Sequence, residues 1–296
     1  MQQDSKKSSS KTEPVINGKV LYSPKGAARE YAAVGCNIYT GCKHDCEYCY
    51  LKRGVLSKAL GGTEVKLKTG FRTGEDAELA FIREANKHLE YLQKVGVFFS
   101  FTTDPLIKET RTVTKNCLIH ARQLGIPVKL LTKNADFLED DKFMFILEKM
   151  QLLKAKIAFG FTLTGHDEME PNASTNAQRI EAMRNLKERG FKTFASIEPI
   201  IDFNSSFDMI QQSAKFCDLF KIGLRSGVKD SYYKPEECAY FMGKVTALCE
   251  KEGFKVYWKE SIRKYMQKHD NGDNFMAAFK VSANFVSMDF NLFKTE

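Results

Sequence analysis

The feature that most constrains the fold is a helical stretch that ends at a glycine and is followed at once by an apolar run. Glycine readily adopts the left-handed conformation that closes a helix. A short, mostly apolar run is typical of a strand that is buried on both faces. The pattern occurs at Gly96 with 97–101, Gly125 with 126–131, Gly190 with 191–197 and Gly253 with 254–258. It predicts buried strands that alternate with helices.

Other segments extend this alternation through the central part of the chain. The runs 157–163 and 218–224 are predicted strands, and residues 31–39 are the expected first strand. Alternating strands and helices indicate an α/β fold with parallel strands. Six strand–helix units and a short seventh strand are too few for an eight-fold barrel, so we expect an open, partial (β/α)6 barrel. The predicted helices lie near 75–94, 113–124, 140–152, 174–189, 205–216 and 234–252, with Thr73 and Ser174 as N-caps and Pro235 in the first helical turn.

Length and composition divide the chain into three expected parts. Residues 1–30 begin with a Lys/Ser-rich run and are expected to be mostly flexible, residues 31–265 to form the barrel, and residues 266–296 to form an aromatic C-terminal extension docked on it. No run of eighteen apolar residues and no signal-peptide core occur, so we expect no membrane segment and a cytoplasmic protein. The eight cysteines do not form a disulfide framework.

Three of these cysteines, Cys42, Cys46 and Cys49, lie at the spacing C-x3-C-x2-C in a polar segment that begins at Gly41. Cysteine thiolates this close together hold iron–sulfur clusters or zinc. A structural zinc site takes four ligands, usually as two separated pairs. A cubane [4Fe–4S] cluster held by three cysteines instead leaves one iron open to a substrate or cofactor.

The cysteine triplet with Tyr48 before its last member resembles the cluster loop of the radical S-adenosylmethionine (SAM) superfamily. The wider string 37–50 resembles the branch that includes spore photoproduct lyase and related proteins, many carried by phages, and the resemblance covers roughly 31–265. It implies a partial barrel with one [4Fe–4S] cluster on Cys42, Cys46 and Cys49, whose open iron chelates SAM. An electron from the cluster would cleave SAM to methionine and a 5′-deoxyadenosyl radical that abstracts a substrate hydrogen. The resemblance further implies a lyase or transferase and an electron donor of the flavodoxin or ferredoxin type.

Polar residues at the predicted strand ends are expected to line the SAM site, because working residues of parallel barrels gather at the carboxyl ends of the strands. Thr103 and Asp104 end the second barrel strand, where the superfamily contacts the methionine amino group, although a Thr-Asp-Pro string replaces the usual Gly-Gly-Glu. Lys133 ends the third strand and is expected to reach the SAM carboxylate or an anionic substrate. The alternatives are a turn residue for Asp104 and a surface lysine for Lys133.

The later strand ends complete the expected site. Thr162 and Thr164 alternate, so their hydroxyl groups share one face that would suit a ribose. Glu198 stands between isoleucines at the end of an apolar strand, where a carboxylate is rare unless it is paired or used. Ile222 belongs to the strand that offers backbone groups to adenine. The predicted cofactor contacts are therefore Tyr48, Thr103, Asp104, Lys133, Thr162, Thr164, Glu198 and Ile222.

Two further features are weaker. Glu170 and Arg179 resemble the family's Glu-Pro…Arg pattern, and we favour a local ion pair over a contact to SAM. Cys36, on the first strand, is a less favoured hydrogen-atom donor. No counterpart of the additional cysteine donor of spore photoproduct lyase is evident, which argues against that particular repair reaction.

The net charge of +8 favours an acidic partner. Basic residues after the cysteine loop are expected to form a rim beside the barrel mouth. Tyr39 and Tyr50 flank that loop and are suited equally to stacking on a base and to packing against the barrel. We therefore expect a nucleic acid or nucleotide substrate, for modification or repair, over a peptide. The alternative is a metal- or cluster-holding nucleic-acid-binding module without SAM chemistry, but Asp104, Thr162 and Glu198 favour an enzyme. The basic residues of the expected rim are Lys52, Arg53, Lys58, Lys66, Lys68 and Arg72.

Overall fold

The computed structural model describes residues 13–54, 57–269 and 282–294. Its centre is an eight-stranded sheet in the order β1-β2-β5-β6-β7-β8-β9-β10. Strand β1 pairs antiparallel with β2, and the pairs from β2 through β10 are parallel. The strands are β1 (Leu21–Tyr22), β2 (Gly35–Cys36), β5 (Val97–Phe99), β6 (Val128–Thr132), β7 (Ile157–Thr162), β8 (Lys192–Ile200), β9 (Leu219–Leu224) and β10 (Lys255–Trp258).

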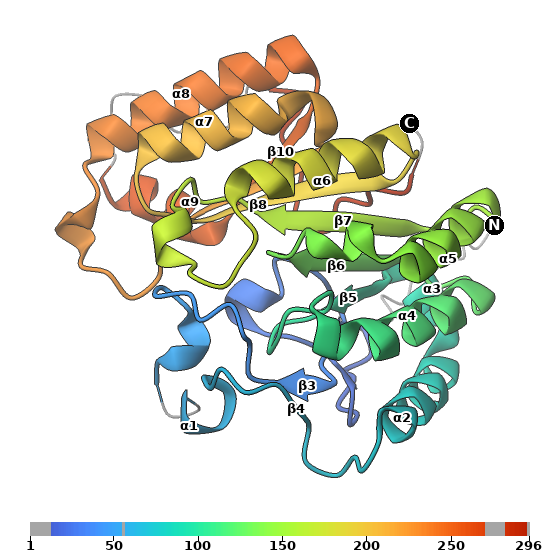
Figure 1. Ribbon diagram of the computed structural model, residues 1–296. Coiled ribbons are helices and arrows are strands. Elements are labelled where there is room, and N and C mark those ends of the chain that lie inside the picture. The colour runs from blue at the N-terminus through green and yellow to red at the C-terminus, as the bar shows by residue number, and fades with distance from the viewer. Residues whose placement is uncertain (1–12, 55–56, 270–281, 295–296) are drawn as a thin grey trace, which may run out of the picture.

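Helices alternate with these strands, and Figure 1 shows them along the outside of the curved sheet. The sheet order does not return from β10 to β1, so the barrel stays open. This confirms the predicted α/β fold and the partial barrel with a short seventh parallel strand. The helices are α1 (Ser57–Leu60), α2 (Gly74–Lys87), α3 (Leu89–Val95), α4 (Lys108–Gln123), α5 (Asp141–Leu152), α6 (Asn176–Glu188), α7 (Phe203–Ser213), α8 (Pro235–Glu252) and α9 (Glu260–Lys268).

The first strand differs most from its predicted range of 31–39. Only Gly35–Cys36 joins the main sheet, and Tyr39–Thr40 (β3) pairs instead with Lys66–Leu67 (β4) in a small separate sheet. Tyr31 lies in the barrel interior, where its hydroxyl group is hydrogen-bonded to strand β8. The segment before the cysteines therefore contains two short strands, β2 and β3, that belong to different sheets.

The helix boundaries follow local capping. Thr73 caps α2 in a capping box with Asp76, and Pro235 stands at the start of α8, as predicted. Helix α6 is capped by Thr175 rather than Ser174, because the Thr175 hydroxyl accepts from the Gln178 backbone. The predicted helix 75–94 is divided at His88 into α2 and α3, and α4 begins at Lys108, before the predicted 113.

The C-terminal segment 282–294 packs into the barrel near the amino ends of its strands. Phe285 bridges to Val256 in parallel, and Leu292 is buried in a cluster with Phe98, Ala158 and Leu219. This segment closes the end of the barrel opposite the strands' carboxyl ends. Residues 270–281 of the expected aromatic extension, Phe275 and Phe279 among them, lie outside the described residues, and the three-part division of the chain stays a prediction. Within the described part, none of the helices has the length and apolar character needed to cross a membrane.

Candidate active site

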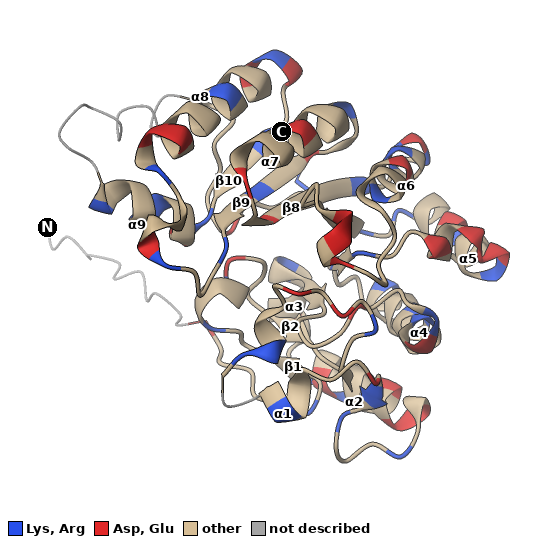
Figure 2. Cartoon of the chain, turned by 60° about the vertical axis from the view of Figure 1, so that its left-hand side comes forward, with Lys and Arg blue, Asp and Glu red and all other residues tan. Residues whose placement is uncertain are grey.

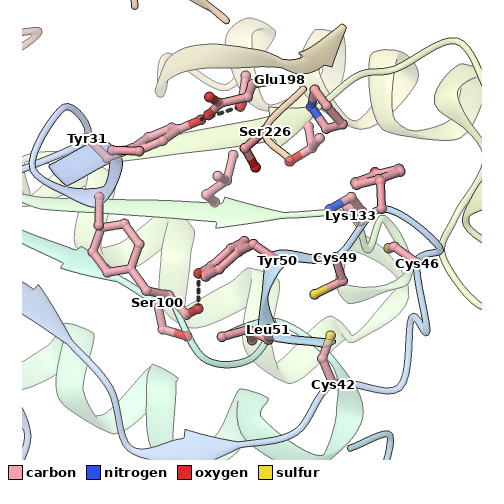
Figure 3. Close-up of a pocket in the computed structure, with 18 of the residues that line it drawn as sticks. Tyr31, Cys42, Cys46, Cys49, Tyr50, Leu51, Ser100, Lys133, Glu198 and Ser226 are labelled. Carbon is pink, nitrogen blue, oxygen red and sulfur yellow. Dashed lines mark hydrogen bonds between the residues drawn. The ribbon is translucent and has the colours of Figure 1, made fainter. Parts of the chain in front are cut away.

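A cavity of about 670 Å³ opens at the carboxyl ends of the parallel strands. Its wall takes residues from the cysteine loop, from the ends of β5 to β9 and from the start of α9. Figure 3 shows the three cysteines on one side and the Tyr31–Glu198 pair on the opposite side. The position agrees with the general rule for parallel barrels. Nine of the predicted site residues line this cavity, namely Cys42, Cys46, Tyr48, Cys49, Thr103, Asp104, Lys133, Thr162 and Glu198.

The cysteine loop begins at a glycine that no other residue can replace without strain. Gly41 has φ +77°, and a Cβ there would lie 2.1 Å from the Glu64 carbonyl oxygen. The Cys42 backbone N–H donates to Gly62 O at 2.9 Å, which fixes the start of the loop. The thiols of Cys42, Cys46 and Cys49 are all free of disulfide bonds. The loop therefore presents three unblocked sulfur ligands to one cavity.

The environment of these thiols bears on what they bind. Burial, with a smaller effect of Asp104, raises the pKa of Cys42 to about 12, and burial raises the pKa of Cys46 as well. Both are therefore protonated thiols until a cation draws off the proton. Among the described residues, no three His, Cys, Asp or Glu side chains are grouped closely enough to hold one metal ion.

A buried His–Asp pair ties the middle of the cysteine loop to the sheet. His44 lies between Cys42 and Cys46, and its Nε2 is 2.8 Å from Oδ2 of Asp104, in the loop after β5. Both side chains are buried. The Asp104 carboxylate also accepts from the Thr132 hydroxyl and from the backbone N–H groups of Leu106 and Lys133, at 2.7–2.9 Å. Both oxygens of Asp104 are thus already engaged by the protein.

A second buried pair holds the other end of the loop. The Tyr48 hydroxyl donates to Glu170, whose other oxygen accepts from Arg179. Arg179 is fully buried and also donates to the carbonyl oxygens of Thr162 at 2.6 Å and Ser174 at 2.7 Å. Glu170 and Arg179 therefore form the local ion pair that was favoured from the sequence. Together, the His44 and Tyr48 contacts clamp the loop to β5, β6 and β7.

Thr103 and Lys133 face the cavity in a different way from Asp104. The Thr103 hydroxyl is enclosed, and it has no hydrogen-bond partner in the described part of the chain. A buried polar atom without a partner is costly and suggests a missing ligand. The Lys133 ammonium group lies 5.3 Å from the centre of the Tyr48 ring. Burial opposes its charge, but Glu170 and, once it is deprotonated, Cys46 outweigh burial and raise the pKa of Lys133.

Glu198 belongs to a buried network on the far side of the cavity. Its Oε2 accepts from the Tyr31 hydroxyl at 2.8 Å and from the ammonium group of Lys259. Lys259 is fully buried and lies 3.6 Å from Glu30 Oε2. Tyr31 is also 2.6 Å from Ser196 Oγ, and burial, with Glu198, raises its pKa well above the usual value. Sequence reasoning missed Glu30, Tyr31 and Ser196, since residues this far apart in the chain carry no shared local pattern.

Thr164 and Ile222 do not line the cavity. The Thr164 hydroxyl is turned into its own loop, where it accepts from the His166 backbone at 3.2 Å. The Ile222 side chain is in the core, and its carbonyl oxygen accepts from the Lys259 backbone at 2.8 Å. Their roles as cofactor contacts stay predictions that the geometry does not support. Cys36 is also away from the cavity, so it is not placed to donate a hydrogen atom there.

The expected basic rim is largely absent from the cavity mouth. Of its members only Lys52 lines the cavity. Lys66 pairs with Glu64 at 2.7 Å, and Lys68 donates to Lys19 O at 2.6 Å, because strand β4 carries this segment away from the sheet. Figure 2 shows acidic and basic residues mixed along the outer helices. Tyr50 lines the cavity and is 56% exposed, whereas Tyr39 does not line it.

Comparison with known proteins gives one family. The model of the radical SAM superfamily matches residues 36–217. An uncharacterized protein of Methanocaldococcus jannaschii is 26% identical in an alignment of 181 positions that covers 56% of this chain and 59% of that protein. The match thus spans less than two thirds of that relative.

Solved structures resemble the whole barrel. Spore photoproduct lyase complexed with dinucleoside spore photoproduct aligns with TM-score 0.61 and 15% identity over 80% of each chain. SuiB of Streptococcus suis, bound to its precursor peptide SuiA, aligns with TM-score 0.54 and 14% identity over 78% of this chain and 50% of that one. SuiB bound to S-adenosylmethionine aligns with TM-score 0.50 and 15% identity over 74% and 44%. At these identities the likeness is one of fold.

Proposed function

The chain belongs to the radical SAM superfamily, and from that premise we propose that Cys42, Cys46 and Cys49 bind the [4Fe–4S] cluster and that SAM occupies the adjoining cavity. The single observation that carries the proposal is a loop of three free thiols, clamped to the sheet at two points and facing one cavity. When bound, the cluster supplies the electron that cleaves SAM to methionine and a 5′-deoxyadenosyl radical.

The residues around the loop suit the polar groups of SAM. The partnerless Thr103 hydroxyl is an acceptor for the SAM ammonium group, and the positive charge of Lys133 suits the SAM carboxylate. Thr162, at the end of β7, lines the same cavity and would contact the ribose of SAM. Asp104 instead positions the loop, because both of its oxygens are engaged. Its earlier assignment as a direct SAM contact stays a prediction.

The remaining wall suits a reactive radical. Phe98, Phe101 and Leu131 give the cavity an apolar surface, and the Tyr31–Glu198–Lys259 network fixes the polar groups at its far side. A dry, rigid wall orients the substrate and keeps water from the radical, which is the part of the chemistry that a protein supplies to its cofactor.

We further propose that the substrate is a nucleic acid or nucleotide. Tyr50 exposes much of its ring at the cavity, which suits stacking on a base. The net charge of +8 favours a phosphate-bearing partner. The fold likeness to spore photoproduct lyase points the same way. The reaction is then a modification or repair of lyase or transferase type, and the reductant that a radical SAM enzyme needs is of the flavodoxin or ferredoxin type.

Anaerobic reconstitution with iron and sulfide tests the chemistry. We expect iron–sulfur absorbance and formation of 5′-deoxyadenosine from SAM with a chemical reductant. Stoichiometric zinc without iron, or a cluster that cleaves no SAM, would favour a binding module without SAM chemistry. Binding of short single- and double-stranded oligonucleotides across a salt series tests the substrate class. We expect the affinity for oligonucleotides to fall steeply as the salt concentration rises. An absence of binding at low salt would favour a peptide or a small molecule as the substrate.

A further inference from the structure

Two arginines belong to or contact the loop that follows β9. Arg225 comes directly after β9 and lines the cavity. Its Nε is enclosed and has no hydrogen-bond partner in the described ranges 13–54, 57–269 and 282–294. Arg53 comes from the segment after the cysteine loop and donates from Nη1 to Ser226 O at 2.9 Å. Neither guanidinium group forms an ion pair with a carboxylate in those same ranges.

The loop is shaped to let these groups approach. Gly227 has φ +74°, and a Cβ at this position would lie 2.6 Å from Arg53 Nη1. A side chain there would be strained and would push the arginine away. Ser226, between the two, is exposed and lies at the cavity in Figure 3, across from the cysteines. The loop thus offers Arg225 and the Ser226 hydroxyl group to the cavity wall, and Arg53, which does not itself line the cavity, is held beside them by its bond to the Ser226 carbonyl oxygen.

No carboxylate of the cavity wall compensates these charges, because each one already has a partner. Glu198 and Glu30 accept from Lys259 and Tyr257 respectively, and Glu260 pairs with Lys264 at 2.9 Å. The other two acidic residues of the wall are paired too, Asp104 with His44 and Asp45 with Lys52. The uncompensated positive charge therefore lies on the β9 side of the mouth.

We propose that Arg225, Arg53 and Ser226 form a phosphate-binding subsite for the substrate, which rests on the proposed function of the cavity. Arginine is permanently charged, and its planar fork binds phosphate oxygens in pairs. A hydroxyl group adds a further donor. The phosphate can belong to a polynucleotide or to a free nucleotide, since both carry the same group.

The subsite is tested first with inorganic pyrophosphate, titrated calorimetrically into the reconstituted protein. Arg225→Gln is expected to weaken binding about tenfold or more, because a charged hydrogen-bonded contact is lost. Arg225→Lys should fall between wild type and Arg225→Gln, since it keeps the charge but loses the fork. Arg53→Gln should weaken binding too. Arg72→Gln is the matched control, a basic residue away from the cavity, and should bind like wild type. Equal pyrophosphate affinity in wild type, Arg225→Gln and Arg53→Gln would overturn the subsite.

Two nucleotide probes then separate the sources of the phosphate and the two proposals. Wild type should prefer a phosphodiester-linked dinucleotide to the same compound with a neutral methylphosphonate link, and Arg225→Gln should lose that preference. A nucleoside triphosphate that binds better than any oligonucleotide assigns the site to a free nucleotide. Pyrophosphate binding that depends on Arg225, without any oligonucleotide binding, would keep the subsite and refute the nucleic acid substrate. Oligonucleotide binding that is unchanged in Arg225→Gln would keep the nucleic acid substrate and refute the subsite. Iron content and the thermal unfolding midpoint of each variant show whether it has folded.

Discussion

Replacing Asp104 by Asn is expected to loosen the cysteine loop before it affects any ligand. The change keeps the size of the side chain but removes its charge. One carboxylate oxygen accepts from Leu106 N at 2.9 Å, and the other accepts from Lys133 N at 2.7 Å and faces His44 Nε2 at 2.8 Å. An asparagine has one acceptor oxygen, so its NH2 group must face donors on one side. In the Oδ2 position the NH2 group faces the Lys133 N–H and disturbs the His44 contact, which holds the loop between Cys42 and Cys46. In the Oδ1 position it faces the Leu106 N–H and leaves that donor without an acceptor.

The size of the effect follows from these contacts. A hydrogen bond to a charged group contributes about 1.5–3 kcal/mol, and a buried donor without a partner costs about 1–3 kcal/mol. Both terms apply at Asp104, so we expect a loss of about 3–5 kcal/mol in the free energy of unfolding, a large part of the roughly 5–15 kcal/mol of a typical protein.

Urea unfolding of the reconstituted protein, with iron analysis, measures this loss. Asp104→Asn should lower the unfolding midpoint without changing the slope, and should reduce the iron bound per chain. The matched control is Asp140→Asn, an N-cap of α5 away from the cavity, where asparagine caps about as well as aspartate. Full iron content and control-like stability, together with weaker SAM binding, would refute this reasoning and return Asp104 to the role of a ligand contact.

Three further predictions concern the cluster, SAM and pH. Cys46→Ala should lose the cluster absorbance and 5′-deoxyadenosine formation, whereas Cys238→Ala, in the core of α8, should keep both; retention of the cluster in Cys46→Ala would place it elsewhere. Thr103→Val preserves the shape of the cavity wall and should keep the iron, but it should weaken SAM binding about 10- to 100-fold in an equilibrium binding assay. An unchanged affinity for SAM would show that Thr103 is not part of the SAM site. Burial lowers the pKa of His166, but Asp202 and Glu168 outweigh it and raise that pKa above its usual value of about 6.5. The stabilisation from His166 should therefore be complete below about pH 6.5 and be lost as pH rises through the raised value, so thermal midpoints measured from pH 5.5 to 8.5 should fall more in wild type than in His166→Gln. Parallel midpoints in the two proteins would contradict it.

The parts of the fold that could be predicted from the sequence are those with a local cause. Glycine at the end of a helix and the apolar run after it act over a few residues, so the strand order along the chain could be predicted. The capping hydroxyl of Thr73 acts three residues ahead, at Asp76. The cysteine spacing is equally local. It indicated a metal-holding loop before any neighbour of that loop was known.

The parts that could not be predicted depend on where distant segments meet. Lys259 reaches Glu198 and Glu30 only because the sheet curves until β10 and the N-terminal segment face the same interior. Lys66 and Lys68 follow the cysteine loop closely in sequence, yet β4 pairs with β3 and carries them off the mouth. Their closeness to the cysteine loop in sequence predicted a place at the cavity mouth, but the pairing of β4 with β3 places them elsewhere. Conversely, Arg225 joins the cavity without any motif to mark it.

The packing of residues 282–294 has a consequence for how the protein is made. These residues contact Phe98, Ala158 and Leu219, which are synthesised long before them. A chain growing on the ribosome therefore exposes the apolar interior of its strands until this segment has left the exit tunnel. During that interval the nascent barrel is a target for chaperones and for aggregation. The cavity at the other end of the barrel also takes late residues into its wall, Lys259 and Lys264 among them, so a cluster delivered before their synthesis would meet an unfinished site.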